Sequence, residues 1–159
     1  MTELDLQRFC ADATDPRHYL RRPWSRDVYT YASNGCIIMR VPRIVGVRTN
    51  AKAPDPTKLM EQKPGEWFPV PKTRMPPEVT CELCEGSGRE PYDKRYKCAE
   101  CMGKKSNPDI KAHTTIGPAK FANRFLALIQ GWQIAPPGKS DPAPIRNGEA
   151  EGLLMPMRI

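Results

Sequence analysis

Two Cys-x-x-Cys units constrain this chain more than any other feature of its sequence. Cys81 and Cys84 form the first unit, and thirteen residues separate it from the second, which is formed by Cys98 and Cys101. Each unit presents two thiolates at a fixed spacing, and four thiolates complete the tetrahedral coordination that Zn²⁺ prefers in structural sites. The spacing therefore predicts one structural zinc ion per chain, held by these four cysteines.

A glycine stands two positions after the second cysteine of each unit, at Gly86 and Gly103. Because glycine lacks Cβ, we expect backbone N–H groups near these positions to turn toward the sulfur atoms. Iron is the main competing metal, but zinc is the commoner occupant of a closed site without redox chemistry. A catalytic zinc ion is not expected, since four cysteines leave no open position for water.

The first unit, Cys-Glu-Leu-Cys-Glu-Gly-Ser-Gly, resembles the repeats in the cysteine-rich domain of J-domain cochaperones. The second unit departs from that pattern, because Lys105 stands where the last glycine belongs. The resemblance is confined to the segment that holds the cysteines. It supports a metal site and does not imply a chaperone.

The remaining sequence indicates a reducing compartment and no membrane span. Cys10 and Cys36 fall on predicted apolar faces, where buried free thiols are expected. The first ten residues lack the basic-then-apolar order of a signal peptide, so we expect a cytoplasmic protein. No run of about 18 apolar residues is present, which argues against a transmembrane helix.

The charge balance favours a polyanionic partner. The chain holds 25 Lys and Arg against 18 Asp and Glu, a formal net charge of +7. Arg21, Arg22 and Arg26 cluster with Trp24 in one predicted loop and are candidates for contacts with DNA phosphates. A solvated basic loop without a ligand is the alternative.

The segment between the two cysteine pairs combines basic and aromatic residues. Its sequence from residue 89 to residue 97 is Arg-Glu-Pro-Tyr-Asp-Lys-Arg-Tyr-Lys. Tyrosines among basic residues are suited to stacking on a nucleic acid strand. The acidic residues of residues 79–105 nearly cancel the basic ones, however, so a merely solvated tip is the alternative.

Local patterns predict an α+β chain with short strands. Residues 3–13 have apolar side chains at helical spacing, and residues 118–130, between a proline and Gly131, show the strongest helical pattern. Two β-rich runs flank Asn34-Gly35 within residues 28–41, which predicts a hairpin with a type I′ turn. Ile-Val-Gly-Val at 44–47 and three short segments after residue 131 are further candidate strands.

Three segments outside the cysteines resemble the bacterial DNA polymerase III β sliding clamp. The tail Glu-Gly-Leu-Leu-Met-Pro-Met-Arg-Ile is similar to the clamp's C-terminus, where a Met-Pro-Met-Arg sequence closes the chain. Ala-Lys-Phe-Ala-Asn-Arg-Phe-Leu-Ala-Leu-Ile is similar to the helix before its final strands. Tyr-Ala-Ser-Asn-Gly-Cys-Ile-Ile-Met-Arg is similar to its hairpins. This combination with an inserted finger is compatible with a phage-encoded protein.

The resemblance implies two helices on a curved antiparallel sheet, formed by residues 1–78 and 106–159, with an inserted zinc finger at 79–105. It also implies that Lys120 and Arg124 face DNA from a helix. The tail would contribute to a cleft for replication proteins, lined by Met155, Pro156 and Met157 with Arg158 at its rim. Clamps build rings from several such domains, so a homo-oligomer is a further expectation.

The leading hypothesis is a non-enzymatic, sliding-clamp-like protein that associates with DNA or with replication proteins. The alternative is a zinc-stabilised adaptor that binds another protein and no DNA. Catalysis is not expected, because the sequence shows no acidic metal cluster, no Ser-His-Asp arrangement and no phosphate-binding loop.

Overall fold

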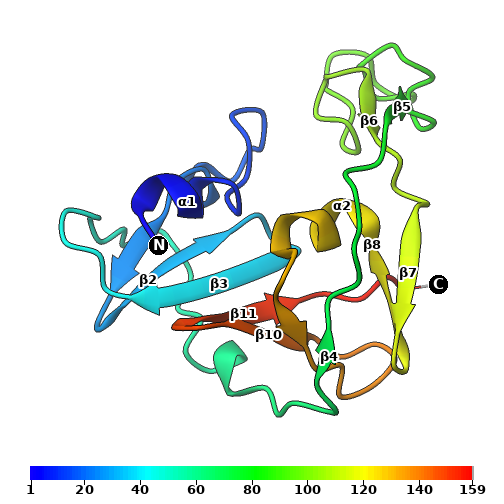
Figure 1. Cartoon of the computed structure of the whole chain (residues 1–159). Helices are drawn as coiled ribbons and strands as arrows, with labels where there is room; N and C mark the ends of the chain where they lie inside the picture. The colour runs from blue at the N-terminus through cyan, green and yellow to red at the C-terminus, as the bar shows by residue number, and fades with distance from the viewer. Residues whose placement is uncertain (159) are drawn as a thin grey trace.

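The computed structural model describes residues 1–158, and its largest element is a curved, seven-stranded antiparallel sheet (Figure 1). The spatial order of its strands is β1-β2-β3-β11-β10-β9-β4. These strands are β1 (Trp24–Arg26), β2 (Tyr29–Ser33), β3 (Ile37–Pro42), β4 (Phe68–Pro69), β9 (Gln133–Ile134), β10 (Ala143–Asn147) and β11 (Ala150–Leu154). The last strand, β11, therefore lies beside the β2–β3 hairpin, although most of the chain separates them in sequence.

The hairpin predicted around Asn34-Gly35 is confirmed, with a different turn. Only Gly35 of this pair has a positive φ, of +92°, whereas a type I′ turn needs two such residues. Asn34 acts through its side chain instead, because its Oδ1 accepts hydrogen bonds from the N–H groups of Cys36 (2.9 Å) and Ile37 (3.0 Å). A side-chain cap thus replaces the second left-handed residue.

Two short helices cover one face of the sheet. They are α1 (Glu3–Gln7) and α2 (Asn123–Leu126), and the 3-10 turn η3 (Ala127–Ile129) prolongs α2. Apolar side chains from the helices and from the sheet form the main core. Its largest fully buried members include Leu6, Phe9, Ile37, Met39, Phe121, Leu126, Ile129, Ile134, Ile145 and Leu154. The expectation of two helices on an antiparallel sheet is met at this level.

The opposite face of the sheet is covered by loops. Trp24 stacks on Tyr31 with ring centroids 5.8 Å apart, and Ile38 and Leu153 extend this second apolar cluster. The covering segments hold the 3-10 turns η1 (His18–Leu20) and η2 (Leu59–Glu61).

The predicted helix over 118–130 is half wrong. Residues 113–122 form a second hairpin, made of β7 (His113–Ile116) and β8 (Ala119–Ala122), and the helix starts only at Asn123. Pro118 follows Gly117 (φ +55°) in the hairpin turn. Ala119 and Phe121 are buried while Lys120 is exposed, and this alternation satisfies a strand as well as the helical pattern does.

Three other expectations need correction. The predicted helix 3–13 ends after Gln7, because the chain then turns so that the Ala11 N–H can bond to the Leu20 carbonyl at 2.9 Å. Residues 44–47 form a turn around Gly46 (φ +94°) and no strand. The final strand stops at Leu154, since Pro156 has no N–H to donate to a ladder.

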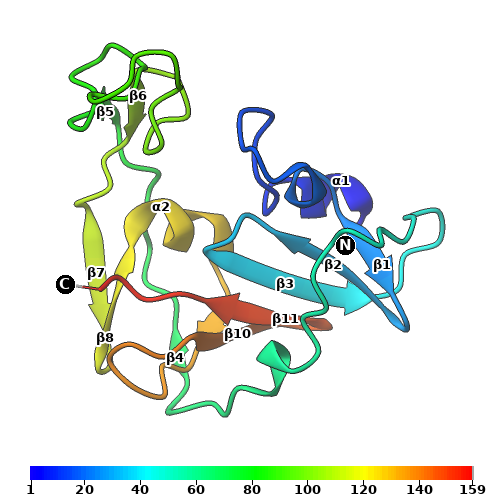
Figure 2. The ribbon, with the colours of Figure 1, turned by 180° about the vertical axis from the view of Figure 1, so that it is seen from behind.

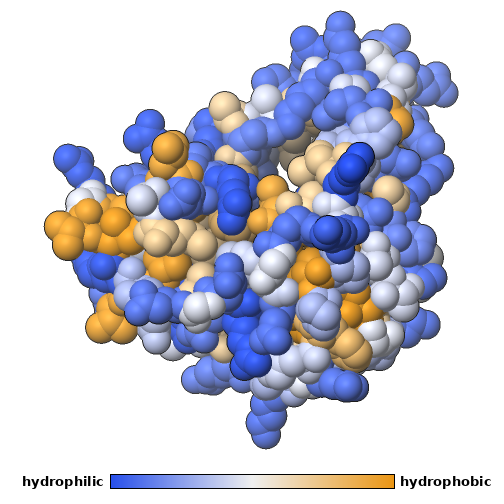
Figure 3. Space-filling model, in the orientation of Figure 1, coloured by the Kyte–Doolittle hydropathy of each residue, from blue (hydrophilic) through white to orange (hydrophobic). Residues whose placement is uncertain are grey.

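The described chain is therefore mostly antiparallel sheet with two short α-helices and a separate projection. That projection rises from the sheet on a thin ribbon, as both ribbon views show (Figures 1 and 2), and its surface is largely hydrophilic (Figure 3). With five residues in the longer α-helix, residues 1–158 hold no helix suited to crossing a bilayer.

Candidate metal centre

The projection begins and ends on a two-stranded ribbon. Strand β5 (Glu78–Thr80) pairs with β6 (Ser106–Pro108), and Thr80 lies opposite Ser106. The ribbon thus brings together the two ends of residues 79–105, which we call the finger. Cys81 follows β5 directly, so the ribbon sets the position of the first ligand.

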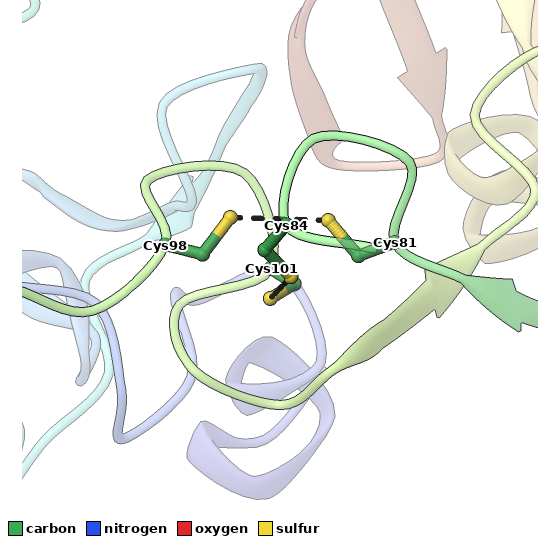
Figure 4. Close-up of side chains that lie close together, drawn as sticks. All are labelled: Cys81, Cys84, Cys98 and Cys101. Carbon is green, nitrogen blue, oxygen red and sulfur yellow. Dashed lines mark hydrogen bonds between the residues drawn. The ribbon is translucent and has the colours of Figure 1, made fainter. Parts of the chain in front are cut away.

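The four cysteines of the two units converge at the centre of the finger (Figure 4). All four sulfur atoms lie within 4.8 Å of one another, and all four residues are buried. The Sγ atoms of Cys81 and Cys98 are 3.8 Å apart, and those of Cys84 and Cys101 are 3.7 Å apart. Four buried thiols at these distances can hold a metal ion.

The two units adopt the same backbone conformation, seventeen residues apart. The residue after each second cysteine has a positive φ, +51° at Glu85 and +53° at Met102. The next residue is a glycine in each unit, with φ of +82° and +84°. The hydrogen bonds are reciprocal: the Cys81 N–H donates to Lys105 O and the Cys98 N–H donates to Gly88 O, both at 3.0 Å.

Lys105 occupies the position that matches Gly88. The φ of Lys105 is +73°, against +74° for Gly88. Lys105 thus adopts a left-handed backbone conformation that favours glycine. The departure from the glycine pattern noted in the sequence therefore leaves the backbone unchanged. It places strain at Lys105 instead.

Backbone N–H groups also point at the sulfur atoms. The Gly88 N–H lies 3.2 Å from Cys84 Sγ. Burial works to raise the pKa of the Cys84 thiol, but this N–H and the neighbouring thiols outweigh it and lower the pKa to about 6. Burial raises the pKa of Cys81 to about 12. The Cys84 thiol therefore ionises more readily than the Cys81 thiol.

The structure separates the basic residues that the sequence grouped as DNA contacts. Arg21 donates to the Asp15 carbonyl at 2.8 Å from Nε, and Arg26 forms an ion pair with Asp55 at 3.0 Å. Arg22 is exposed. The shared helix face expected for Lys120 and Arg124 does not exist, because Lys120 lies on β8 and Arg124 on α2.

Residues Met155–Arg158, the tail, pass between the β2–β3 loop and β8 (Figure 2). The Met155 N–H donates to Cys36 O at 2.9 Å, and the Met157 N–H donates to Lys120 O at 2.8 Å. All four tail residues line a pocket of about 290 Å³ together with Cys36, Ile110, Ala122, Arg124 and Phe125. Arg124 thus lies beside the tail, and its Nε is buried with no hydrogen-bond partner among the described residues.

A second pocket, of about 280 Å³, adjoins the tail pocket, and no pattern in the sequence predicts it. It shares Cys36 and Met155 with the tail pocket, and Tyr19, Ile38, Leu59 and Leu153 are among its other lining residues. These residues come from four distant segments, so no local pattern marks them as one site. The only signal was the group of apolar residues at Ile37-Ile38 and Leu153-Leu154, which a core explains equally well.

The comparisons with known proteins do not place this chain in a family. No family model matches the sequence, and no curated protein is significantly similar to it.

Proposed function

We propose that the four-cysteine centre binds one structural zinc ion. A tetrahedron with Zn–S distances of about 2.3 Å has its sulfur atoms roughly 3.8 Å apart, close to the 3.7 and 3.8 Å of the two sulfur pairs. Four thiolates leave no coordination position for substrate, so the ion would stabilise the finger and carry out no chemistry. Elemental analysis of purified protein should find one zinc per chain. A coloured, iron-containing protein would contradict this assignment.

We further propose a non-enzymatic, sliding-clamp-like protein that binds replication proteins at the tail and also associates with DNA. One observation carries this proposal: two pockets meet at Cys36 and Met155, beside a tail that resembles the clamp's C-terminus. Together they form an extended apolar surface on which a short peptide can place two apolar side chains. Methionine suits such a surface because its side chain adapts to different partners.

The two pockets differ in their polar groups, which favours one direction of the bound peptide. Arg124 and Arg158 line the tail pocket, and no acidic side chain lines it. The unpartnered Nε of Arg124 can donate to a carbonyl or carboxylate of the peptide. We therefore expect the apolar end of a linear motif in the pocket with Tyr19 and its polar or acidic end near Arg124.

An NMR titration with a clamp-binding peptide tests this proposal. Met157→Ala should weaken the peptide's affinity about tenfold, because it removes part of the pocket wall. Met75→Ala is the matched control, since Met75 is 50% exposed and lies outside both pockets. If the peptide perturbs no signal from the tail, or if both variants bind alike, the tail is a closing segment of the core.

The proposed DNA association rests on the distribution of charge. The finger holds six basic and five acidic side chains, so most of the +7 charge belongs to the body, which we define as residues 1–78 and 106–159. Arg22 and Lys120 are exposed and free to contact phosphates. Replacing both with Glu should weaken duplex binding and reduce its salt dependence. Lys139→Glu, at another exposed lysine, is the control.

A zinc-stabilised adaptor that binds no DNA is the second candidate. Arg21 and Arg26, which the sequence grouped as DNA contacts, make their hydrogen bonds and ion pair within the chain. Peptide binding at the tail with no salt-dependent DNA binding would favour the adaptor.

A further inference from the structure

Between its two cysteine pairs the finger forms a short hairpin, residues 89–97, which we call the tip hairpin. The Glu90 N–H donates to the Tyr96 carbonyl at 3.1 Å, and the Tyr96 N–H donates to the Asp93 carbonyl at the same distance. Tyr92 is 98% exposed and Tyr96 is 62% exposed. The Tyr92 ring is almost fully free to stack on a partner. The Arg95 guanidinium lies 5.9 Å from the centroid of the Tyr96 ring, so a planar cation stands beside the second exposed aromatic side chain.

Four basic side chains of the finger have no carboxylate partner among residues 1–158. Among the basic residues of the finger, Arg95 and Lys104 form ion pairs, with Asp93 and Asp12 respectively. The free basic residues are Arg89, Lys94, Lys97 and Lys105. Their positive charge is thus available to an anion from outside the chain.

The acidic residues of the finger are mostly engaged elsewhere. Glu82 forms an ion pair with Lys111 at 2.8 Å, and Glu90 accepts a hydrogen bond from the Ala99 N–H at 2.7 Å. Glu100 faces the metal centre, with its Oε2 3.1 Å from Cys81 Sγ. Residues 89–97 hold four basic and two acidic side chains, so the tip hairpin is net basic although the finger as a whole is nearly neutral.

Three of the free basic residues gather around two facing glycines. Lys97 packs over Gly103, since a Cβ built there would lie 3.3 Å from Lys97 Cδ, and a Cβ built at Gly88 would lie 3.2 Å from Lys105 Cγ. Arg89 is the partner of Lys97 across the tip hairpin. Position 105 has a left-handed backbone that would suit glycine better than lysine. The backbone conformation therefore does not explain why a lysine stands there.

We propose that this surface binds single-stranded nucleic acid without sequence preference. Nucleobases would stack on Tyr92 and Tyr96, and the phosphates between them would contact Arg89, Lys97 and Lys105. A single strand fits these groups better than a duplex, because only unpaired bases expose their faces to a protein ring. The site is separate from the tail and from Lys120, so it can stand or fall without the functions proposed for the body.

Fluorescence anisotropy with labelled dT12, rU12 and a 12-base-pair duplex tests the proposal on the full chain. The protein should bind both single strands more tightly than the duplex, and any preference between dT12 and rU12 would identify the polymer. Tyr92→Ser with Tyr96→Ser should weaken single-strand binding at least about tenfold. The matched Tyr92→Phe, Tyr96→Phe variant should retain it, because phenylalanine still stacks.

Lys105→Gly separates a role in binding from a role in folding. Glycine relieves the left-handed strain and should make the finger hold its metal more firmly. It also removes one phosphate contact, so binding should weaken and its log–log salt slope should fall by about 0.7. Lys139→Gly, far from the finger in sequence and exposed, should leave the slope unchanged.

Zinc content measured on every variant shows that the finger remains folded. Serine variants that keep their zinc and bind dT12 within about twofold of the unaltered chain would overturn the proposal. Equal affinity for the duplex, or full competition by a polyglutamate peptide, would overturn it as well. Peptide binding at the tail should be the same in all these variants, which distinguishes failure at the finger from failure at the tail.

Discussion

The finger and the body of this protein are stabilised in opposite ways. The body buries a continuous apolar core that includes Phe121, Leu126 and Ile145. The buried apolar cluster of the finger consists of its four cysteines, while Leu83, Tyr92 and Tyr96 are exposed. The body can therefore fold by hydrophobic burial, whereas we expect the finger to depend on a metal ion bound by its thiolates.

The largest expected effect is that of removing the metal, which should unfold the finger and leave the body folded. Cys84→Ser should abolish zinc binding and unfold residues 79–105, since metal binding supplies about 10 kcal/mol or more in modules of this kind. The body should keep its dispersed NMR signals. Cys36→Ser, at a half-buried thiol outside the finger, should retain one zinc per chain. Loss of the whole NMR spectrum in Cys84→Ser would show that the body depends on the finger.

The converse change removes apolar volume from the body. Phe121 is completely buried, so Phe121→Ala should reduce the free energy of unfolding of the body by about 3–5 kcal/mol. Urea denaturation followed by tryptophan fluorescence measures this loss. Tyr92→Ala, at an exposed ring of the finger, should change the same quantity by less than about 0.5 kcal/mol. Comparable losses in both variants would mean that the finger and the body unfold as one unit.

A smaller effect concerns backbone strain in the finger. Lys105→Gly should stabilise the metal-bound finger by about 1 kcal/mol, because it removes a non-glycine residue from a left-handed position. Gly88→Ala should do the opposite: its φ is +74°, and the added Cβ would lie 2.9 Å from the Gly103 carbonyl oxygen. Competition with a zinc chelator measures both changes. Equal chelator resistance in the two variants would show that left-handed strain at these positions does not limit metal binding.

The smallest effect is expected at the ion pair that links the two regions, between Lys104 of the finger and Asp12 of the body. Both side chains are about half exposed, so Asp12→Asn should cost no more than about 0.5–1 kcal/mol. Its measurable consequence should be a change in the orientation of the finger, detected by residual dipolar couplings. Salt at about 0.5 M should produce the same change in the unaltered chain.

The pKa of Asp12 defines the pH range of this link. Burial opposes ionisation, but Lys104 and Thr14 outweigh it and lower the pKa to about 2. A carboxyl with a lowered pKa stabilises the folded state above its unfolded pKa of 3.8, and that contribution is lost as the pH falls toward 2. The orientation of the finger should therefore be constant between pH 5 and pH 8, a range in which Asp12 stays ionised. A change within that range would assign the link to other groups.

Residue spacing alone was sufficient for the cysteine cluster and for the β2–β3 hairpin. Four thiols at Cys-x-x-Cys spacing have few other stable arrangements, and Asn34-Gly35 directs a turn through local hydrogen bonds. Both features depend on atoms within a few bonds or one loop of each other. Local chemistry of this kind can be predicted without knowing what surrounds it.

Tertiary structure alone decided the state of residues 119–122 and the place of Arg124. Their apolar pattern suits a helix and a strand equally, and pairing with His113–Ile116 selected the strand. That choice shortened the helix and placed Arg124 beside the tail, which runs between the β2–β3 loop and β8. Strand pairing and burial depend on segments far apart in the chain, so their energy cannot be assigned to any one segment of the sequence.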